Sequence, residues 1–189
     1  LADKGILTDL YTCIDKDGDI GREDFIPSVL SSLEDDGRLY VMAPEFKLVT
    51  VVGSEGLLNA DEDWNFTTMY ELLEKYSGAQ LFAREKNSFE LERFLKYSMD
   101  LFYDKDTGEC SFESDDFINM LKFVQTLPDT YTSVPDDEIN DKLKKKEVLL
   151  ENFDSMDIIN IKMLDMHFDN IEKVYLGYPS KSHASAQIV

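Results

Sequence analysis

The sequence contains few of the residues that carry disulfide frameworks and metal sites. Of its 189 residues, two are cysteine, two are histidine and one is tryptophan. Two cysteines are too few for a disulfide framework, and we expect Cys13 and Cys110 to be small buried side chains. No stretch approaches the roughly 18–20 apolar residues of a membrane span. We therefore expect no membrane span in this segment.

Basic residues are also scarce. The 19 Lys and Arg residues stand against 39 Asp and Glu residues, which gives a formal net charge of −20 and a pI near 4.3. Nucleic acids and anionic membranes are polyanions that recruit Lys and Arg, so the charge argues against both as partners. Hydrophobic residues make up 43% and aromatic residues 12%, a globular composition. The length suits one domain or two small ones.

Hydrophobic periodicity predicts a helix-rich α/β chain in which helices separate the strands. A capping box formed by Thr68 and Glu71 marks the start of one helix, and Ser114 and Ser155 are expected to cap two others. Gly53 is expected to end a strand. Helical segments are expected over residues 7–14, up to 33, 68–77, from 87 or 88 onward, 115–127, 136–146 and 156–167, and strands over 39–43, 46–52, 148–153 and 171–178.

Two turns resemble cation-binding loops without completing the pattern. Residues 15–19 and 104–108 are similar to the opening of a calcium-binding EF-hand loop, which needs Gly at position six and an acid at position twelve. The first turn places Ile20 and Ile26 at these positions, and the second places Glu109 at position six. We interpret both as Asx-rich surface turns.

No other cofactor or catalytic motif is complete. His167 and His183 do not share zinc-ligand spacing with each other or with a cysteine. Residues 53–56 lack the length and the lysine of a phosphate loop, and they do not form a Gly-x-Ser-x-Gly nucleophile elbow. Acid pairs are uninformative in a chain with 39 carboxylates. We therefore predict no metal, no cofactor and no catalytic residue.

Aromatic side chains stand next to acids and amides at several expected strand ends and loops. Sugar sites combine an aromatic face, which packs on the sugar ring, with carboxylates and amides that bind its hydroxyls. An aromatic residue at such a position is also common in a core, so the pattern favours a sugar site without requiring one. The groups are Glu45-Phe46, Trp64-Asn65, Phe112-Glu113 and Asn152-Phe153-Asp154.

Three stretches carry a resemblance to a known family: residues 1–10 (LADKGILTDL), 36–44 (DGRLYVMAP) and 64–69 (WNFTTM). Together they resemble the extracellular solute-binding proteins of bacterial ABC importers, in the sugar-binding group (family 1). Residues 1–10, LADKGILTDL, are similar to that family's Leu-Ala-x-x-Gly-Leu-Leu-x-x-Leu stretch. Residues 36–44, DGRLYVMAP, resemble its Gly-Lys-Leu-Tyr-x-Leu-Pro segment, which leads to the hinge. Residues 64–69, WNFTTM, resemble the Trp-Thr-Trp-Asp-Glu-Phe start of a second-lobe helix, with Asn and Thr in place of Thr and Asp.

The resemblance implies a periplasmic-binding-protein-like (type II) fold, helix-rich α/β, with two lobes joined by crossing strands and a ligand cleft between them. Residues 1–48 would be a portion of lobe one and its approach to the hinge, and residues 49–174 would be the second lobe. Residues 175–189 would be a return strand toward lobe one and a loose tail. The segment would then hold mainly the second lobe and half of a binding site.

The implied function is capture of a carbohydrate outside the cell and its delivery to an ABC transporter permease, with no bond made or broken. The protein would be extracellular and tethered to the cell surface as a lipoprotein, with its signal outside this segment. Phe66 is assigned to the core. The implied ligand contacts are Glu45, Phe46, Trp64, Asn152, Phe153 and Asp154.

Two other functions stay open at this point. The chain could be an enzyme or accessory module of carbohydrate metabolism that uses some of its many acids, or an acidic protein-interaction domain. A catalytic carboxylate needs a perturbed environment, which is a property of the folded chain.

Overall fold

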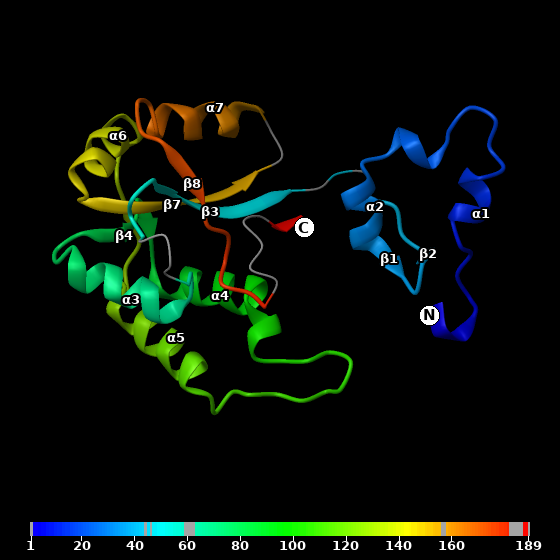
Figure 1. Ribbon diagram of the computed structural model, residues 1–189, viewed down its shortest axis with the longest axis horizontal. Coiled ribbons are helices and arrows are strands. Elements are labelled where there is room, and N and C mark those ends of the chain that lie inside the picture. The colour runs from blue at the N-terminus through cyan, green and yellow to red at the C-terminus, as the bar shows by residue number, and fades with distance from the viewer. Residues whose placement is uncertain are drawn as a thin grey trace. The chain divides into compact units, whose positions relative to one another are not determined.

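The protein divides into two compact units, each with its own core. The smaller unit comprises Leu1–Lys47 and Ile188–Val189, and the larger one comprises Leu48–Gln187. Both are drawn in the computed structural model of Figure 1. The structure describes residues 2–43, 45, 47–58, 63–155, 158–181 and 187–188.

The smaller unit is built from short elements around four buried side chains. Pro27 is the first residue of α2, where its missing N–H is not needed, and Gly5 has a left-handed backbone with φ +62°. The expected strand over residues 39–43 is reduced to β2, which pairs antiparallel with β1. The buried side chains are Tyr11, Ile14, Leu30 and Leu39. The elements are η1 (Ala2–Lys4), α1 (Tyr11–Ile14), η2 (Arg22–Asp24), α2 (Pro27–Leu33), β1 (Glu34–Asp35) and β2 (Arg38–Leu39).

The larger unit is organised around a mixed sheet with strand order β4-β7-β3-β8, and a further strand, β9, pairs with β3. The long central strands β3 and β7 are antiparallel, and β8 is antiparallel to β3. Only the β4–β7 pair is parallel among the pairings described for this sheet. The strands are β3 (Leu48–Ser54), β4 (Gln80–Phe82), β7 (Val148–Ser155), β8 (Lys173–Tyr175) and β9 (Gln187–Ile188).

Helices cover both faces of this sheet (Figure 1). One face carries α3 (Phe66–Lys75), α4 (Asn87–Tyr97) and α5 (Asp115–Thr126), and the other carries α6 (Asp136–Lys145) and α7 (Ile158–His167). A short turn of helix, η3 (Met99–Leu101), follows α4. Two short strands, β5 (Arg84–Glu85) and β6 (Thr132–Ser133), form a separate antiparallel pair.

The main core lies between the sheet and the helices α3, α4 and α5. Its aromatic side chains contact one another: the Phe66 ring lies 5.0 Å from that of Phe94 and 6.1 Å from that of Phe102, measured between centroids. Phe66 is 2% exposed, which confirms its assignment to the core. A second apolar cluster lies under α6 and α7 and includes Ile139, Leu143, Leu164 and Phe168.

Several local expectations were wrong. Cys13 and Cys110 are exposed rather than buried. Ser155 is the last residue of β7 and not the cap of α7. Gly53 lies inside β3 rather than ending it, and it pairs with Leu150 on β7. A side chain at this position would crowd Leu150, since a Cβ there would lie 3.0 Å from Leu150 Cδ2.

The cap of α3 also lies one turn earlier than expected. Asn65 is the cap: its side chain accepts from the Thr68 backbone N–H at 3.0 Å, and the Thr68 hydroxyl accepts from the Asn65 backbone N–H at 2.8 Å. None of the helices in the described part of the chain has the length and apolarity needed to cross a bilayer.

Candidate functional site

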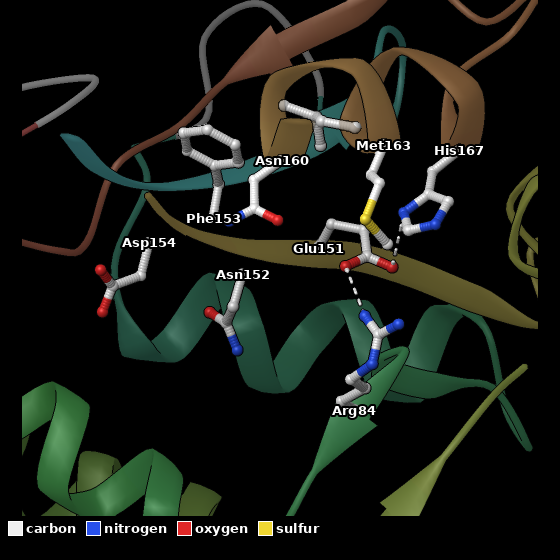
Figure 2. A pocket seen from close by; sticks show the side chains of 9 residues that line it. Arg84, Glu151, Asn152, Phe153, Asp154, Asn160, Met163 and His167 are labelled. Atoms are coloured by element: carbon white, nitrogen blue, oxygen red, sulfur yellow. Dashed lines mark ion pairs between the residues drawn. The ribbon is translucent and has the colours of Figure 1, made fainter. Parts of the chain in front are cut away.

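The strongest candidate site is a cavity at one end of the parallel strand pair. The carboxyl ends of parallel strands lie at one edge of a sheet, and ligands of open α/β sheets bind beyond that edge. Arg84 follows β4, and Asp154 lies near the end of β7. The cavity has a volume of about 180 Å³. The described residues that line it are Arg84, Glu151, Asn152, Phe153, Asp154, Asn160, Met163, Leu164 and His167 (Figure 2).

Buried ionisable side chains form the polar side of this cavity. The side chain of Glu151 is 6% exposed and that of His167 is 5% exposed. Glu151 Oε2 lies 3.9 Å from Arg84 Nη1, and Glu151 Oε1 lies 3.7 Å from His167 Nδ1. Figure 2 shows the carboxylate between these two partners. The distance to Arg84 fits an ion pair, the distance to His167 would fit one only with a protonated imidazole, and both exceed the range of a hydrogen bond.

Burial shifts both groups toward their neutral forms. It raises the pKa of Glu151 from 4.5 to about 7, and the carboxylate of Asp136 adds to the rise while the Arg84 guanidinium opposes it. Burial also lowers the pKa of His167 below 6.5, although Asp136 acts in the opposite direction. At neutral pH His167 is therefore uncharged, and Glu151 is close to half protonated.

The apolar side of the cavity is formed by β7 and α7. Phe153 packs against the second apolar cluster, and Met163 and Leu164 come from α7. An apolar wall that faces a small number of polar groups is the usual composition of a small-molecule site.

The opposite face of β7 carries a second buried carboxylate in a fully bonded network. Glu90, on α4, is 0% exposed and forms an ion pair with Arg93. The Asn152 amide donates to both Glu90 carboxylate oxygens, at 3.3 and 3.2 Å, and its Oδ1 accepts from the Tyr178 hydroxyl at 2.8 Å. Burial raises the pKa of Glu90 to about 7. Asn152 thus ties β7 to α4 and to the segment after β8.

The six contacts expected from sequence fall in different places. The structure brings Asn152, Phe153 and Asp154 together at the cavity. Trp64 lies elsewhere: its indole N–H donates to the Gly177 carbonyl at 2.9 Å, and its ring packs on the main core. Glu45 is exposed in the smaller unit, and Phe46 lies outside the described residues. As ligand contacts, all six remain predictions.

Sequence reasoning missed Arg84, Glu151 and His167. Glu151 carried a usable signal, because it is the one acid inside the apolar run 148–150 and 153 that predicts a buried strand. His167 was considered only as a zinc ligand, and nothing local distinguishes Arg84. Within the described residues, no group of three or more His, Cys, Asp and Glu side chains is arranged to hold a metal ion.

Comparison with known proteins identifies the fold. No protein-family model matches the chain, and no curated protein matches it either. Among solved structures, the sugar-binding protein MalE from Xanthomonas citri aligns with 96% of this chain at 13% identity and a TM-score of 0.54. Maltose-bound MalE3 from T. maritima aligns with 98% of it at 13% identity and a TM-score of 0.51. The ABC substrate-binding protein Lmo0181 from Listeria monocytogenes, in complex with cycloalternan, aligns with 95% of it at 16% identity and a TM-score of 0.48.

The chain has part of the periplasmic-binding-protein fold. It spans about half of the proteins it matches, 50% of the X. citri protein and 51% of the T. maritima protein. The expected helix-rich α/β, type II periplasmic-binding-protein-like class is therefore confirmed, as is the resemblance to sugar-binding proteins at the level of the fold. The boundary between the two units lies between Lys47 and Leu48. Their assignment to two lobes remains a prediction, as does the return of residues 175–189 toward the first.

Proposed function

We propose that this chain belongs to a protein that captures a carbohydrate outside the cell and delivers it to an ABC transporter permease. The observation that carries the proposal is the alignment of 96% of the chain with the X. citri sugar-binding protein MalE at a TM-score of 0.54. The larger unit would be the second lobe and the smaller unit a portion of the first. Tethering to the cell surface as a lipoprotein is part of the same proposal.

The cavity beside β7 supports carbohydrate as the ligand class. Phe153 supplies an aromatic face, and Asp154 supplies a carboxylate at the end of the strand. These groups lie on β7 just beyond the carboxyl end of the parallel strand β4, which ends opposite Leu150, and open α/β sheets bind ligands beyond the carboxyl ends of their parallel strands. In the proposed protein this edge faces the cleft, and closure of the lobes follows from ligand contacts made by both.

An enzyme of carbohydrate metabolism is the second candidate, and one observation favours it. A carboxyl group whose pKa is about 7 in a cavity, as found for Glu151, is suited to act as a general acid at neutral pH. A binding protein and an enzyme are separated by the fate of the ligand, because only an enzyme converts it.

The test is a thermal-shift screen of the full-length protein against monosaccharides, oligosaccharides, amino acids and peptides. A ligand at 100 times its dissociation constant adds about 2.7 kcal/mol to the free energy of unfolding, so we expect a raised melting temperature with a saccharide. Chromatography then shows whether the ligand is recovered unchanged. A converted saccharide would establish the enzyme, and stabilisation by none of the compounds would leave the acidic interaction domain.

The substitution Asp154→Asn tests whether the site lies at the end of β7. It removes one carboxylate charge from the cavity. We expect calorimetry to show an affinity for the saccharide that is about ten-fold weaker, because one hydrogen bond to a charged group is lost. Asp141→Asn is the matched control, because Asp141 is exposed on α6 and does not line the cavity. Equal affinities for the two variants would contradict this location.

A further inference from the structure

Four ionisable side chains from four different elements form a cluster at the cavity beside β7, and three of them, Arg84, Glu151 and His167, line it. Arg84 comes from β5, Asp136 from the first position of α6, Glu151 from β7 and His167 from the last position of α7. Arg84 forms an ion pair with Asp136 as well as with Glu151. His167 Nε2 lies 3.8 Å from Asp136 Oδ1. The arrangement is held by the sheet and by both helices on this face.

Two polar atoms of this cluster lack the partners that buried polar atoms normally have. Glu151 Oε1 and His167 Nε2 are buried, and no hydrogen bond reaches either of them from the described residues. An unsatisfied buried polar atom has an energetic cost of about 1–3 kcal/mol, and such atoms are usually explained by a missing water, an ion or a ligand. Both residues line the same cavity.

The charges of the cluster favour a neutral ligand. The guanidinium of Arg84 is already paired with the Asp136 carboxylate, and His167 is uncharged at neutral pH because burial lowers its pKa. What remains is a partial negative charge on Glu151, and the exposed Asp154 carboxylate also lines the cavity. These carboxylates repel an anion, and the cost of burying an ammonium group opposes a cation, whereas a hydroxyl group can donate to the Glu151 carboxylate without bringing a charge.

The size of the cavity limits the ligand to one small group. Its volume of about 180 Å³ lies below the roughly 300–1,000 Å³ of a pocket for a drug-sized molecule. A larger hollow of about 400 Å³ lies between α3 and α5, but its lining side chains, such as Tyr70 and Lys122, are exposed or half-buried. The cavity beside β7, unlike this hollow, is lined by buried side chains with unsatisfied polar atoms, Glu151 and His167.

We propose that this cavity is a subsite for one uncharged, hydroxyl-bearing ring of a saccharide, and that a ring hydroxyl donates a hydrogen bond to the Glu151 carboxylate. The inference rests on the proposed function and adds to it the charge of the ligand and the residue that selects it. Phe153, Met163 and Leu164 cover the apolar face of the ring. Arg84 and His167 hold the carboxylate in position from either side (Figure 2).

A hydroxyl that donates to the carboxylate favours its ionised form, so ligand binding releases a proton from Glu151. If binding lowers the pKa of Glu151 by one unit, the affinity for the saccharide is ten-fold higher when Glu151 is fully ionised than when it is fully protonated. We therefore expect the saccharide to bind about ten-fold more tightly at about pH 8.5 than at about pH 5.5, because the free carboxyl has a pKa of about 7.

The experiment is calorimetry on the full-length protein with glucose, galactose, maltose and maltotriose, and with glucuronate and glucosamine as the charged probes. We expect a neutral saccharide to bind and both charged sugars to bind at least ten-fold more weakly. In Glu151→Gln the affinity should fall about ten-fold at pH 8.5 and its pH dependence should disappear. Glu85→Gln is the matched control, because Glu85 is also buried with a raised pKa but does not line the cavity.

The outcomes separate this inference from the proposed function. A neutral saccharide that binds Glu151→Gln as tightly as the unchanged protein, with the same pH dependence, would overturn the subsite and leave carbohydrate capture standing. Tighter binding of glucuronate or glucosamine would overturn the neutral-ligand inference in the same way. Binding of no saccharide at all would overturn both. Circular dichroism of each variant shows whether its loss of affinity comes from unfolding.

Discussion

At the scale of single residues, the central strand β7 has polar side chains on both faces of the sheet. Glu151 faces α7 on one side of the sheet, and Asn152 holds the buried Glu90 on the other. Glu90 and Glu151 both have pKa values raised to about 7, in each case mainly by burial. Their surroundings differ, since Glu90 is fully bonded and Glu151 has an oxygen without a hydrogen bond.

These two carboxyls predict that the protein loses stability as the pH rises from about 5 to 7. Both are protonated in the folded and the unfolded chain below their ordinary pKa of 4.5. Between 4.5 and 7 the unfolded chain ionises first and binds fewer protons, so the free energy of unfolding falls as the pH rises. Each group should remove about 1–3 kcal/mol by pH 8.

Urea unfolding at pH 5 and at pH 8 measures this loss. Glu90→Gln and Glu151→Gln should each flatten the pH profile, because glutamine does not ionise. Glu92→Gln, at an exposed position on α4, should leave the profile unchanged. If the pH profiles of all three variants run parallel to that of the unchanged protein, neither buried carboxyl is responsible for the loss of stability.

At the scale of elements, the start of α3 shows how local chemistry sets a boundary. Asn65 and Thr68 bond reciprocally, each side chain to the other's backbone N–H. The Thr68 hydroxyl also donates to the Asp63 carbonyl at 2.6 Å. Thr68 and Glu71 matched the sequence signature of the same motif, but Thr68 already occupies the third helical position.

The observed cap at Asn65 and the capping box expected at Thr68 and Glu71 predict different effects of substitution. Asn65→Ala should lower the free energy of unfolding by about 1 kcal/mol, since it removes the acceptor for the Thr68 N–H. Glu71→Ala should change it by less than about 0.5 kcal/mol, because Glu71 is exposed within the helix. Urea unfolding distinguishes the two. A larger effect at Glu71 than at Asn65 would contradict the observed cap.

Elements with strong local signals could be predicted from the sequence. Ser114 caps α5 as expected, accepting from the Phe117 N–H. Strand ends were less predictable, because they depend on pairing partners far along the chain. Gly53 illustrates this: the residue looked like a strand end, and only its contact with Leu150 explains why it lies inside β3.

Like the elements, the candidate site could be predicted only where neighbouring residues in the sequence carried the signal. The segment 152–154 stood out because an aromatic residue stands between an amide and an acid at an expected strand end, and the structure places the segment at the cavity. Arg84 and His167 are 67 and 16 residues from Glu151 in sequence, and no local pattern links the three. Their proximity is set by the parallel pairing of β4 with β7 and by the packing of α7 on the sheet.

At the scale of the whole molecule, the net charge of −20 opposes compact folding. Repulsion among surface carboxylates is greatest at low ionic strength, where the Debye length is about 30 Å at 0.01 M salt, and it is screened at 0.15 M, where that length is about 8 Å. We therefore expect the melting temperature to rise between these NaCl concentrations. Differential scanning calorimetry at the two salt concentrations measures the change. A melting temperature that falls would contradict the expected repulsion.

The pairing of β3 with β7 has a consequence for how the chain acquires its structure. These strands are adjacent in the sheet but lie roughly 100 residues apart in sequence, and such distant pairing slows folding because a long loop must close first. At a synthesis rate of about 5–20 residues per second, β3 leaves the ribosome about 5–20 s before β7 does. During that interval β3 lacks the strand that pairs with it, and an unpaired strand edge is exposed to association with other chains.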